Sequence, residues 1–150
     1  MRIFCKMVAA CAILIAAWSS GFAADGKPHR VTLQVDQNDP AVMNLVLNNV
    51  SNIMEMYKTR GEDVQIEIVA NGPGLHMLRD DTSPVKDRLK QIADLNSPSQ
   101  IRFSACNNTR EGMEKHEGHP ITLVPQASLV PSGAVRLMEL QEDGWSYLKP

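Results

Sequence analysis

Apolar and polar residues alternate along several short stretches of the chain. Between positions 30 and 36 the apolar residues are Val31, Leu33 and Val35, which predicts a strand with one face in a core. The stretch 64–70 is rich in β-branched residues, and three further short apolar stretches occur at 101–105, 121–125 and 145–148. Short stretches of this kind, bounded by Gly, Pro, Asn and Ser, are typical of strands. We therefore predict about five strands.

Stretches with helical spacing lie between these strands. Asp39 followed by Pro40 is a favoured helix start, and Gly61 is a favoured helix end. The apolar positions between them recur at helical spacing: Val42, Leu45, Val46, Val50, Ile53, Met54 and Tyr57. Ser83 with Pro84 opens a second helix, and Ser132 opens one that ends at Gly144. A short helical turn at 75–81 and a short, weak helix at 107–118 complete the pattern.

Strands that alternate with helices indicate βαβ units and a mainly parallel sheet covered by helices on both faces. Ligands of such sheets bind beyond the carboxyl ends of the strands. Four polar or glycine-rich segments follow the first four predicted strands, and we expect them to gather on one rim: "DQNDP", "ANGPG", "ACNNT" and "VPQASLVPSG".

The first residues have the three-part pattern of a secretory signal peptide. Arg2 and Lys6 precede the apolar run 7–18, and "SSGFA" then supplies small residues. The run is shorter than the roughly 20 residues that a membrane-spanning helix needs. We predict a signal peptide at 1–23, a flexible lead-in at 24–29 and one domain at 30–150. The mature protein is then periplasmic or secreted and carries no membrane segment.

Cleavage after Ala23 changes the cysteine count and the charge. Cys5 and Cys11 leave with the signal peptide, so Cys106 remains as the one cysteine and no internal disulfide is possible. The mature chain has 13 basic and 17 acidic residues, a formal net charge of −4. A mildly acidic chain without a basic stripe is not expected to bind nucleic acid.

Cys106 lies at the predicted junction of a strand and a helix, within "FSACNNT". Unpaired N–H groups at a helix amino terminus favour negative charge and lower the pKa of a thiol. Asn107, Asn108 and Thr109 are short polar residues suited to such a terminus, and Arg110 adds a positive charge. A buried and inert cysteine is the alternative, because a free thiol also packs like a small apolar side chain.

Two further segments offer polar groups. Asn71, Gly72 and Gly74 lie in "ANGPG", where a tight turn would expose N–H groups to an anion; a simple strand-ending turn is the alternative. His76 follows and is placed to polarise a thiol on the neighbouring loop. "HEGH" brings His116 and His119 close in sequence, but a metal-binding motif is missing and a solvated face explains the pair better. We predict no metal.

The order of these motifs resembles the DsrE/DsrF-like family, particularly its small members with a signal peptide. The resemblance covers roughly residues 30–150 and rests on "EIVANGPG", "FSACNNT" and "LVPSGAVRLMELQEDGWSYLKP". It implies a three-layer α/β/α fold and assembly as a homo-oligomer, most often a trimer or hexamer. Thr109 stands where some relatives have a second cysteine.

Better-known relatives carry sulfane sulfur as a persulfide on a cysteine in the position of Cys106. The resemblance therefore implies a sulfur carrier that works with a donor or acceptor protein and needs no cofactor. The alternative is a non-catalytic protein that binds a small ligand or supports an assembly, with Cys106 as a structural residue. A weaker third possibility is metal binding through the histidines.

Overall fold

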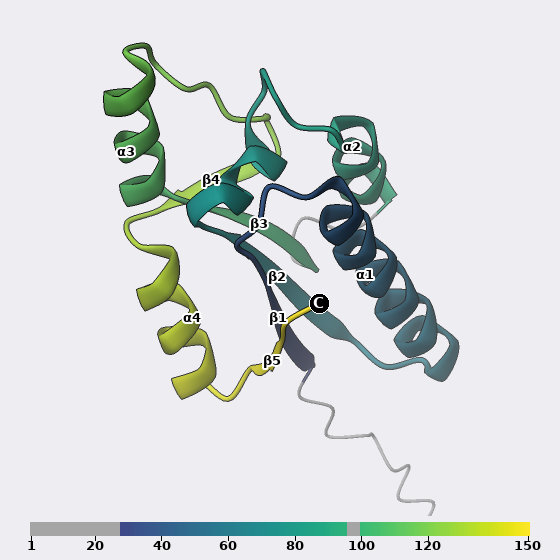
Figure 1. Ribbon diagram of the computed structural model, residues 1–150. Helices are drawn as coiled ribbons and strands as arrows, with labels where there is room; N and C mark the ends of the chain where they lie inside the picture. Colours follow the sequence, from purple (N-terminus) through teal and green to yellow (C-terminus); the bar gives the residue numbers. More distant parts are fainter. Residues whose placement is uncertain (1–27, 96–99) are drawn as a thin grey trace, which may run out of the picture.

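Five parallel strands form one sheet in the computed structural model, which describes residues 28–95 and 100–150 (Figure 1). Their order across the sheet is β4-β3-β2-β1-β5. The strands are β1 (His29–Val35), β2 (Val64–Ala70), β3 (Ile101–Cys106), β4 (Ala127–Val130) and β5 (Ser146–Leu148). The predicted signal peptide and most of the predicted lead-in lie outside the described residues.

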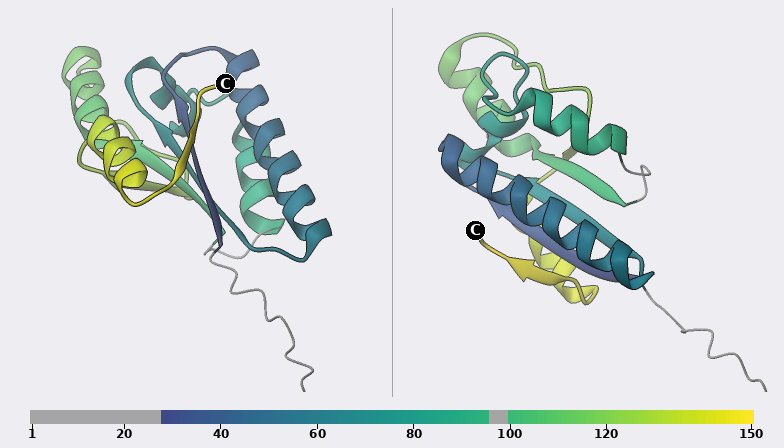
Figure 2. Two further views of the ribbon diagram at one scale, coloured as in Figure 1. Left: turned by 90° about the horizontal axis from the view of Figure 1, so that it is seen from below. Right: turned by 90° about the vertical axis from the view of Figure 1, so that its right-hand side faces the viewer.

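Helices cover both faces of the sheet, so the predicted three-layer α/β/α class is confirmed (Figure 2). One face carries α1 (Pro40–Arg60) and α2 (Lys86–Leu95), and the other carries α3 (Asn107–Glu117) and α4 (Gly133–Glu142). A short 3-10 helix, η1 (Gly72–Leu78), follows β2 at the predicted helical turn. Within the described part of the chain, no helix is both long enough and apolar enough to cross a membrane.

Local sequence signals explain both ends of α1. The Asp39 side chain accepts a hydrogen bond from the Ala41 amide, and Gly61 ends the helix in the left-handed region with φ 68°. The buried face of α1 contains Val46 and Val50 of the predicted apolar stripe and also Met43 and Leu47. Leu45, another residue of that stripe, is 46% exposed.

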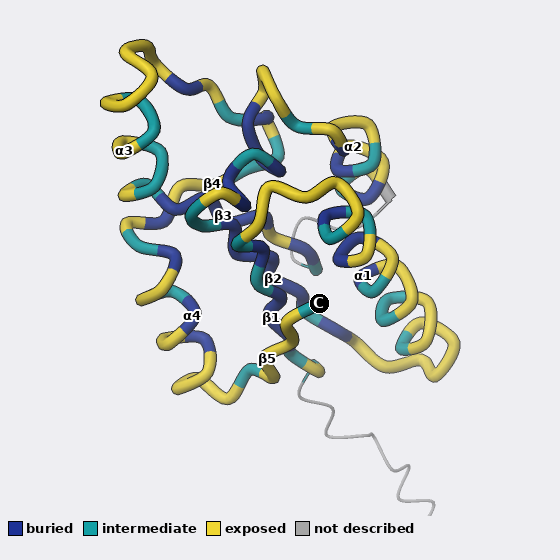
Figure 3. The backbone as a smooth tube through the Cα atoms, in the orientation of Figure 1, coloured by how far each residue is buried: buried dark blue, intermediate teal, exposed yellow. Residues whose placement is uncertain are grey.

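The two faces of the sheet are packed unequally (Figure 3). The α1/α2 face holds the main core, where the predicted alternation of β1 places Val31, Leu33 and Val35. The opposite face holds a small cluster of Val69, Leu137 and Leu140, and α3 has no buried residue at all. Polar contacts therefore make a larger contribution to the position of α3 and α4 than to that of α1.

The prediction of the fourth strand at 121–125 was wrong, because that segment pairs with a loop instead of the sheet. Leu123 forms an isolated antiparallel bridge with Arg79, and the Val124 amide donates to the Leu78 carbonyl at 2.9 Å. The sheet edge is formed by 127–130, which the sequence analysis placed in the following loop. An alternating apolar pattern predicts an extended backbone but does not identify the partner of that backbone.

Candidate functional site

The carboxyl ends of the strands meet at one rim, as predicted. The Asn71 amide donates to the Val35 carbonyl at 3.0 Å, which ties the segment after β2 to the end of β1. The Asn108 amide donates to the Pro131 carbonyl at 3.2 Å, which ties the start of α3 to the end of β4. Cys106 is the last residue of β3 and lies between these two contacts.

Two helix amino termini converge on Cys106. The residue is the N-cap of α3 without a side-chain capping hydrogen bond, and the Asn108 and Thr109 amides in the first turn of that helix lower the pKa of its thiol. The amide of Gly133, the first residue of α4, shifts the pKa of the thiol in the same direction. The residue is 4% exposed and its thiol is free. The arrangement gives a sulfur that is largely shielded from solvent and lies at the amino termini of two helices.

These contacts determine the acidity of the thiol. Burial raises the pKa of Cys106, but hydrogen bonds from the Thr109 side chain and from the Gly133, Thr109 and Asn108 amides lower it. The hydrogen bonds outweigh burial, so the pKa of the thiol lies below its ordinary value. The helix termini add to this effect, because their dipoles favour an anion. The predicted depression of the thiol pKa therefore has a geometric basis.

Thr109 connects the predicted loop at 71–74 to the sulfur. The Gly72 amide donates to Thr109 Oγ1 at 3.0 Å. An N–H group can only donate, so the hydroxyl proton of Thr109 is available for the sulfur of Cys106. Gly72 thus acts on the thiol through Thr109, and its φ of 52° lies in the region that favours glycine.

Asn71 and Gly74 are also fixed at the rim. Asn71 Oδ1 accepts from Gln34 Nε2 at 3.1 Å. A Cβ atom at Gly74 would lie 2.1 Å from the Val35 carbonyl oxygen, so glycine is required there. The close backbone approach predicted for Gly74 is therefore made by β1 of the same chain.

The other predicted site residues lie at different places. Asn107 accepts from Arg110 through Oδ1 and donates to Glu111, so its side chain belongs to the outer face of α3. The Nδ1 atom of His76 lies 2.8 Å from Thr82 Oγ1. Its predicted effect on the thiol stays a prediction.

The "HEGH" histidines lie near the end of α3 and beyond it. His119 Nε2 pairs with Glu117 at 3.3 Å, and both histidines are exposed. Among residues 28–95 and 100–150, no group of three or more His, Cys, Asp and Glu side chains is arranged to hold a metal ion.

Gly133 is a further residue of the candidate site that the sequence patterns did not predict. A Cβ atom there would lie 2.8 Å from Asn71 Cβ and 3.2 Å from Cys106 Cβ, so α4 approaches the rim as closely as a glycine permits. The signal in the sequence is Ser132, whose side chain accepts from the Val135 amide and caps α4. A capped helix start directly after a strand in this sheet class predicts N–H groups at the rim.

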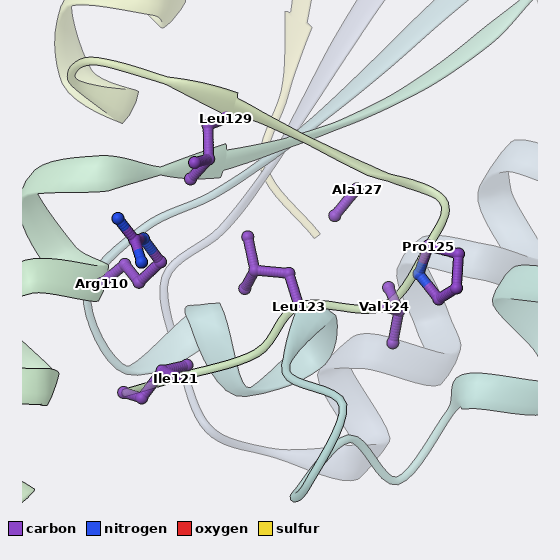
Figure 4. A pocket seen from close by; sticks show the side chains of 7 residues that line it. All are labelled: Arg110, Ile121, Leu123, Val124, Pro125, Ala127 and Leu129. Carbon is purple, nitrogen blue, oxygen red and sulfur yellow. The ribbon is translucent and has the colours of Figure 1, made fainter. Parts of the chain in front are cut away.

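Two surface hollows flank β4. One of about 380 Å³ has apolar walls with Arg110 at its margin, and Figure 4 shows the seven side chains that line it: Arg110, Ile121, Leu123, Val124, Pro125, Ala127 and Leu129. The other, of about 310 Å³, lies against α4 and is bounded by residues that include Val130 and Val135. Cys106 lines neither hollow, so the thiol site is a separate feature of the rim.

The fold and the site define an α/β protein with a shielded thiol at the carboxyl edge of its sheet. No family model matches the chain, and no curated protein matches it. The chain is similar to the structure of a protein of unknown function from Methanobacterium thermoautotrophicum, with 29% identity, a TM-score of 0.68, and coverage of 81% of this chain and 99% of the other. A conserved protein of unknown function from Bacteroides thetaiotaomicron matches with 18% identity and a TM-score of 0.49, over 80% of this chain and 93% of the other.

Proposed function

We propose that this protein is an exported thiol protein that carries sulfane sulfur as a persulfide on Cys106. The observation that carries the proposal is the position of the largely buried Cys106 at the amino termini of α3 and α4, where the Thr109 hydroxyl and nearby amides lower the pKa of its thiol. Such donors stabilise a thiolate, which is the nucleophilic form of cysteine. The resemblance of the sequence motifs to the DsrE/DsrF-like family supports sulfur as the cargo.

The transfer needs no oxidant and no cofactor. The Cys106 thiolate attacks the outer sulfur of a donor persulfide, R–S–SH, and forms a new S–S bond. The S–S bond of the donor breaks, and R–S⁻ leaves with the electron pair. The products are Cys106–S–SH and the donor thiolate. An acceptor thiolate then attacks the outer sulfur of Cys106 and releases the Cys106 thiolate.

The rim donors have a role in each step. They stabilise negative charge on the sulfur of Cys106 before the attack and again when this sulfur is the leaving group in the second transfer. Low exposure of the site keeps water from the loaded sulfur. A donor or acceptor must therefore present its sulfur on a narrow or extended group, such as a small thiol or a cysteine on a loop.

Intact-mass measurement of the protein purified from its native compartment tests this function. We expect a species heavier by one sulfur atom, which is lost after reduction and is absent from the Cys106→Ser variant. Incubation of the reduced protein with a small-molecule persulfide should restore the heavier species. If Cys106 takes up no sulfur under these conditions, the proposal is wrong.

A structural Cys106 in a non-catalytic binding or assembly protein is the second candidate. Its supporting observation is the 4% exposure of the residue, which also suits an inert core thiol. Titration with a small thiol reagent at neutral pH separates the two candidates. A reactive thiolate is modified rapidly in the folded protein, whereas a structural thiol is modified only after unfolding.

We also propose that the mature protein is a homo-oligomer, with a trimer or hexamer as the expected form. Beside the family resemblance, exposed apolar side chains on neighbouring elements support this proposal. Leu129 on β4 is 49% exposed, and Val135 and Met138 on α4 are 50% and 60% exposed. Light scattering at micromolar concentration should give a mass several times that of one mature chain, and the mass of one chain would contradict it.

A further inference from the structure

We propose that the buried ion pair between Arg136 and Glu67 is a positioning device that holds the first turn of α4 against Cys106. This inference rests on the proposed function, in which Cys106 works as a thiolate. It assigns a role to two residues that do not touch the sulfur and that lie far apart in the sequence.

The pair is anchored in the middle of the sheet. Glu67 lies on β2 and is 2% exposed, and its two carboxylate oxygens accept from Arg136 Nε at 2.8 Å and Arg136 Nη2 at 2.7 Å. The Ser104 hydroxyl on β3 donates to the same carboxylate at 2.6 Å. A two-point contact of this kind fixes both the distance and the orientation of the guanidinium group.

The rest of α4 is held by few contacts. Its buried apolar side chains are Leu137 and Leu140, which pack on Val69 with Trp145 beside them. Leu140 lies two helical turns from Gly133 and Leu137 about one turn, whereas Arg136 lies less than one turn from it and makes the charged contact. The ion pair is therefore the strong anchor of the end of α4 that reaches the thiol.

Gly133 transmits this anchoring to the sulfur. Its Cα packs so closely that a Cβ atom would lie 3.2 Å from Cys106 Cβ, and its amide is one of the groups that lower the pKa of the Cys106 thiol. Hydrogen bonds weaken steeply as the donor moves away. A small outward movement of the first turn would thus remove one N–H donor and the positive end of the α4 dipole from the thiolate.

The charges around the site allow position and charge to be separated. Several charged side chains on the elements around Cys106 form pairs or lie close to a partner: Arg110 with Glu114 on α3, Arg136 with Glu67 and Glu139 between α4 and β2, and Arg102 on β3 near Glu67. Removing Arg136 and Glu67 together leaves the net charge near the sulfur unchanged. An effect of the double change on the thiol must then come from position.

The main variant is Glu67→Gln with Arg136→Met, which removes both charges and keeps an acceptor for Ser104. Apolar replacement of a buried pair often leaves a protein folded. Arg88→Met is the matched control, because Arg88 binds Asn44 and Asn48 between α2 and α1 on the opposite face of the sheet. A second variant, Arg136→Lys, keeps the charge and loses only the two-point geometry.

The measurement is the ultraviolet absorbance of the thiolate against pH, with a Cys106→Ser blank in each background. We expect the midpoint of the double variant to rise by about one pH unit, which is a tenfold decrease in the ionisation constant of the Cys106 thiol. The midpoint of Arg136→Lys should rise by less. The Arg88→Met midpoint should match the wild type. If the wild-type midpoint is depressed and both Arg136 variants keep it, the positioning role is refuted while the proposed function stands. A wild-type midpoint at the ordinary value for a thiol would refute both the positioning role and the proposed function.

Discussion

Gly133→Ala places a methyl group where α4 meets the rim. The added Cβ would lie 2.8 Å from Asn71 Cβ and 3.2 Å from Cys106 Cβ, whereas apolar carbons normally pack at about 3.5–4.0 Å. Both neighbouring atoms are attached directly to the backbone, so neither can move away by a simple side-chain rotation. The first turn of α4 must therefore shift outward.

The sign of the stability change distinguishes local from tertiary effects. Helix propensity alone predicts that Gly→Ala stabilises by about 0.5–1 kcal/mol. Overpacking of a close contact costs about 1–3 kcal/mol. We expect the contact to dominate, so that Gly133→Ala lowers the free energy of unfolding by about 1–2 kcal/mol. Movement of the Gly133 amide away from the sulfur should also raise the thiol midpoint by about one pH unit.

Gly112→Ala on α3 is the matched control. No atom lies within 4 Å of a Cβ added at Gly112, so only the propensity gain remains, and this variant should be more stable by about 0.5–1 kcal/mol with an unchanged thiol midpoint. Urea unfolding and thiolate absorbance against pH measure the two quantities. If Gly133→Ala is as stable as Gly112→Ala and keeps the wild-type midpoint, then α4 does not determine the properties of Cys106.

Three other changes test separate parts of the structure. Thr109→Val removes the hydroxyl donor and should raise the thiol midpoint of Cys106. Thr109→Ser keeps the hydroxyl and should leave the midpoint near the wild-type value. Equal midpoints in the two variants would contradict donation from the Thr109 hydroxyl to the sulfur. Arg79 hydrogen-bonds to Asp81 and holds the pKa of that carboxyl at about 2, and it also lowers the pKa of Glu117. Both folded-state pKa values lie below the unfolded ones, so the stabilisation from the two carboxylates is complete above about pH 4.5 and is lost as the pH falls toward 2. Arg79→Met should therefore lower stability at neutral pH and make stability, measured by urea unfolding, depend less on acid pH. An unchanged dependence of stability on pH would refute this. The mature amino terminus should be Ala24 or Asp25 by Edman sequencing of the secreted or periplasmic fraction, and recovery of Met1 from membranes would contradict export.

Sequence patterns predicted the elements that depend on neighbouring residues. The alternation at Val31, Leu33 and Val35, the Asp39 cap and the Gly61 end are local features, and the structure confirms each of them. The position of Cys106 at a strand–helix junction is equally local. Because strands alternate with helices, the parallel three-layer arrangement followed from the sequence as well.

Tertiary structure alone decided which groups outside the strand–helix junction act on the thiol. Gly133 reaches the sulfur because α4 returns to the rim, and Arg136 is held there by Glu67 from a strand 69 positions earlier in the chain. Residues 127–130 form the sheet edge, whereas the segment 121–125 pairs through Leu123 with the loop that carries Arg79. This choice also depends on tertiary contacts. Local propensity reports what a backbone segment can adopt, whereas the donors around a buried atom depend on contacts between segments distant in sequence, which no short stretch of residues encodes.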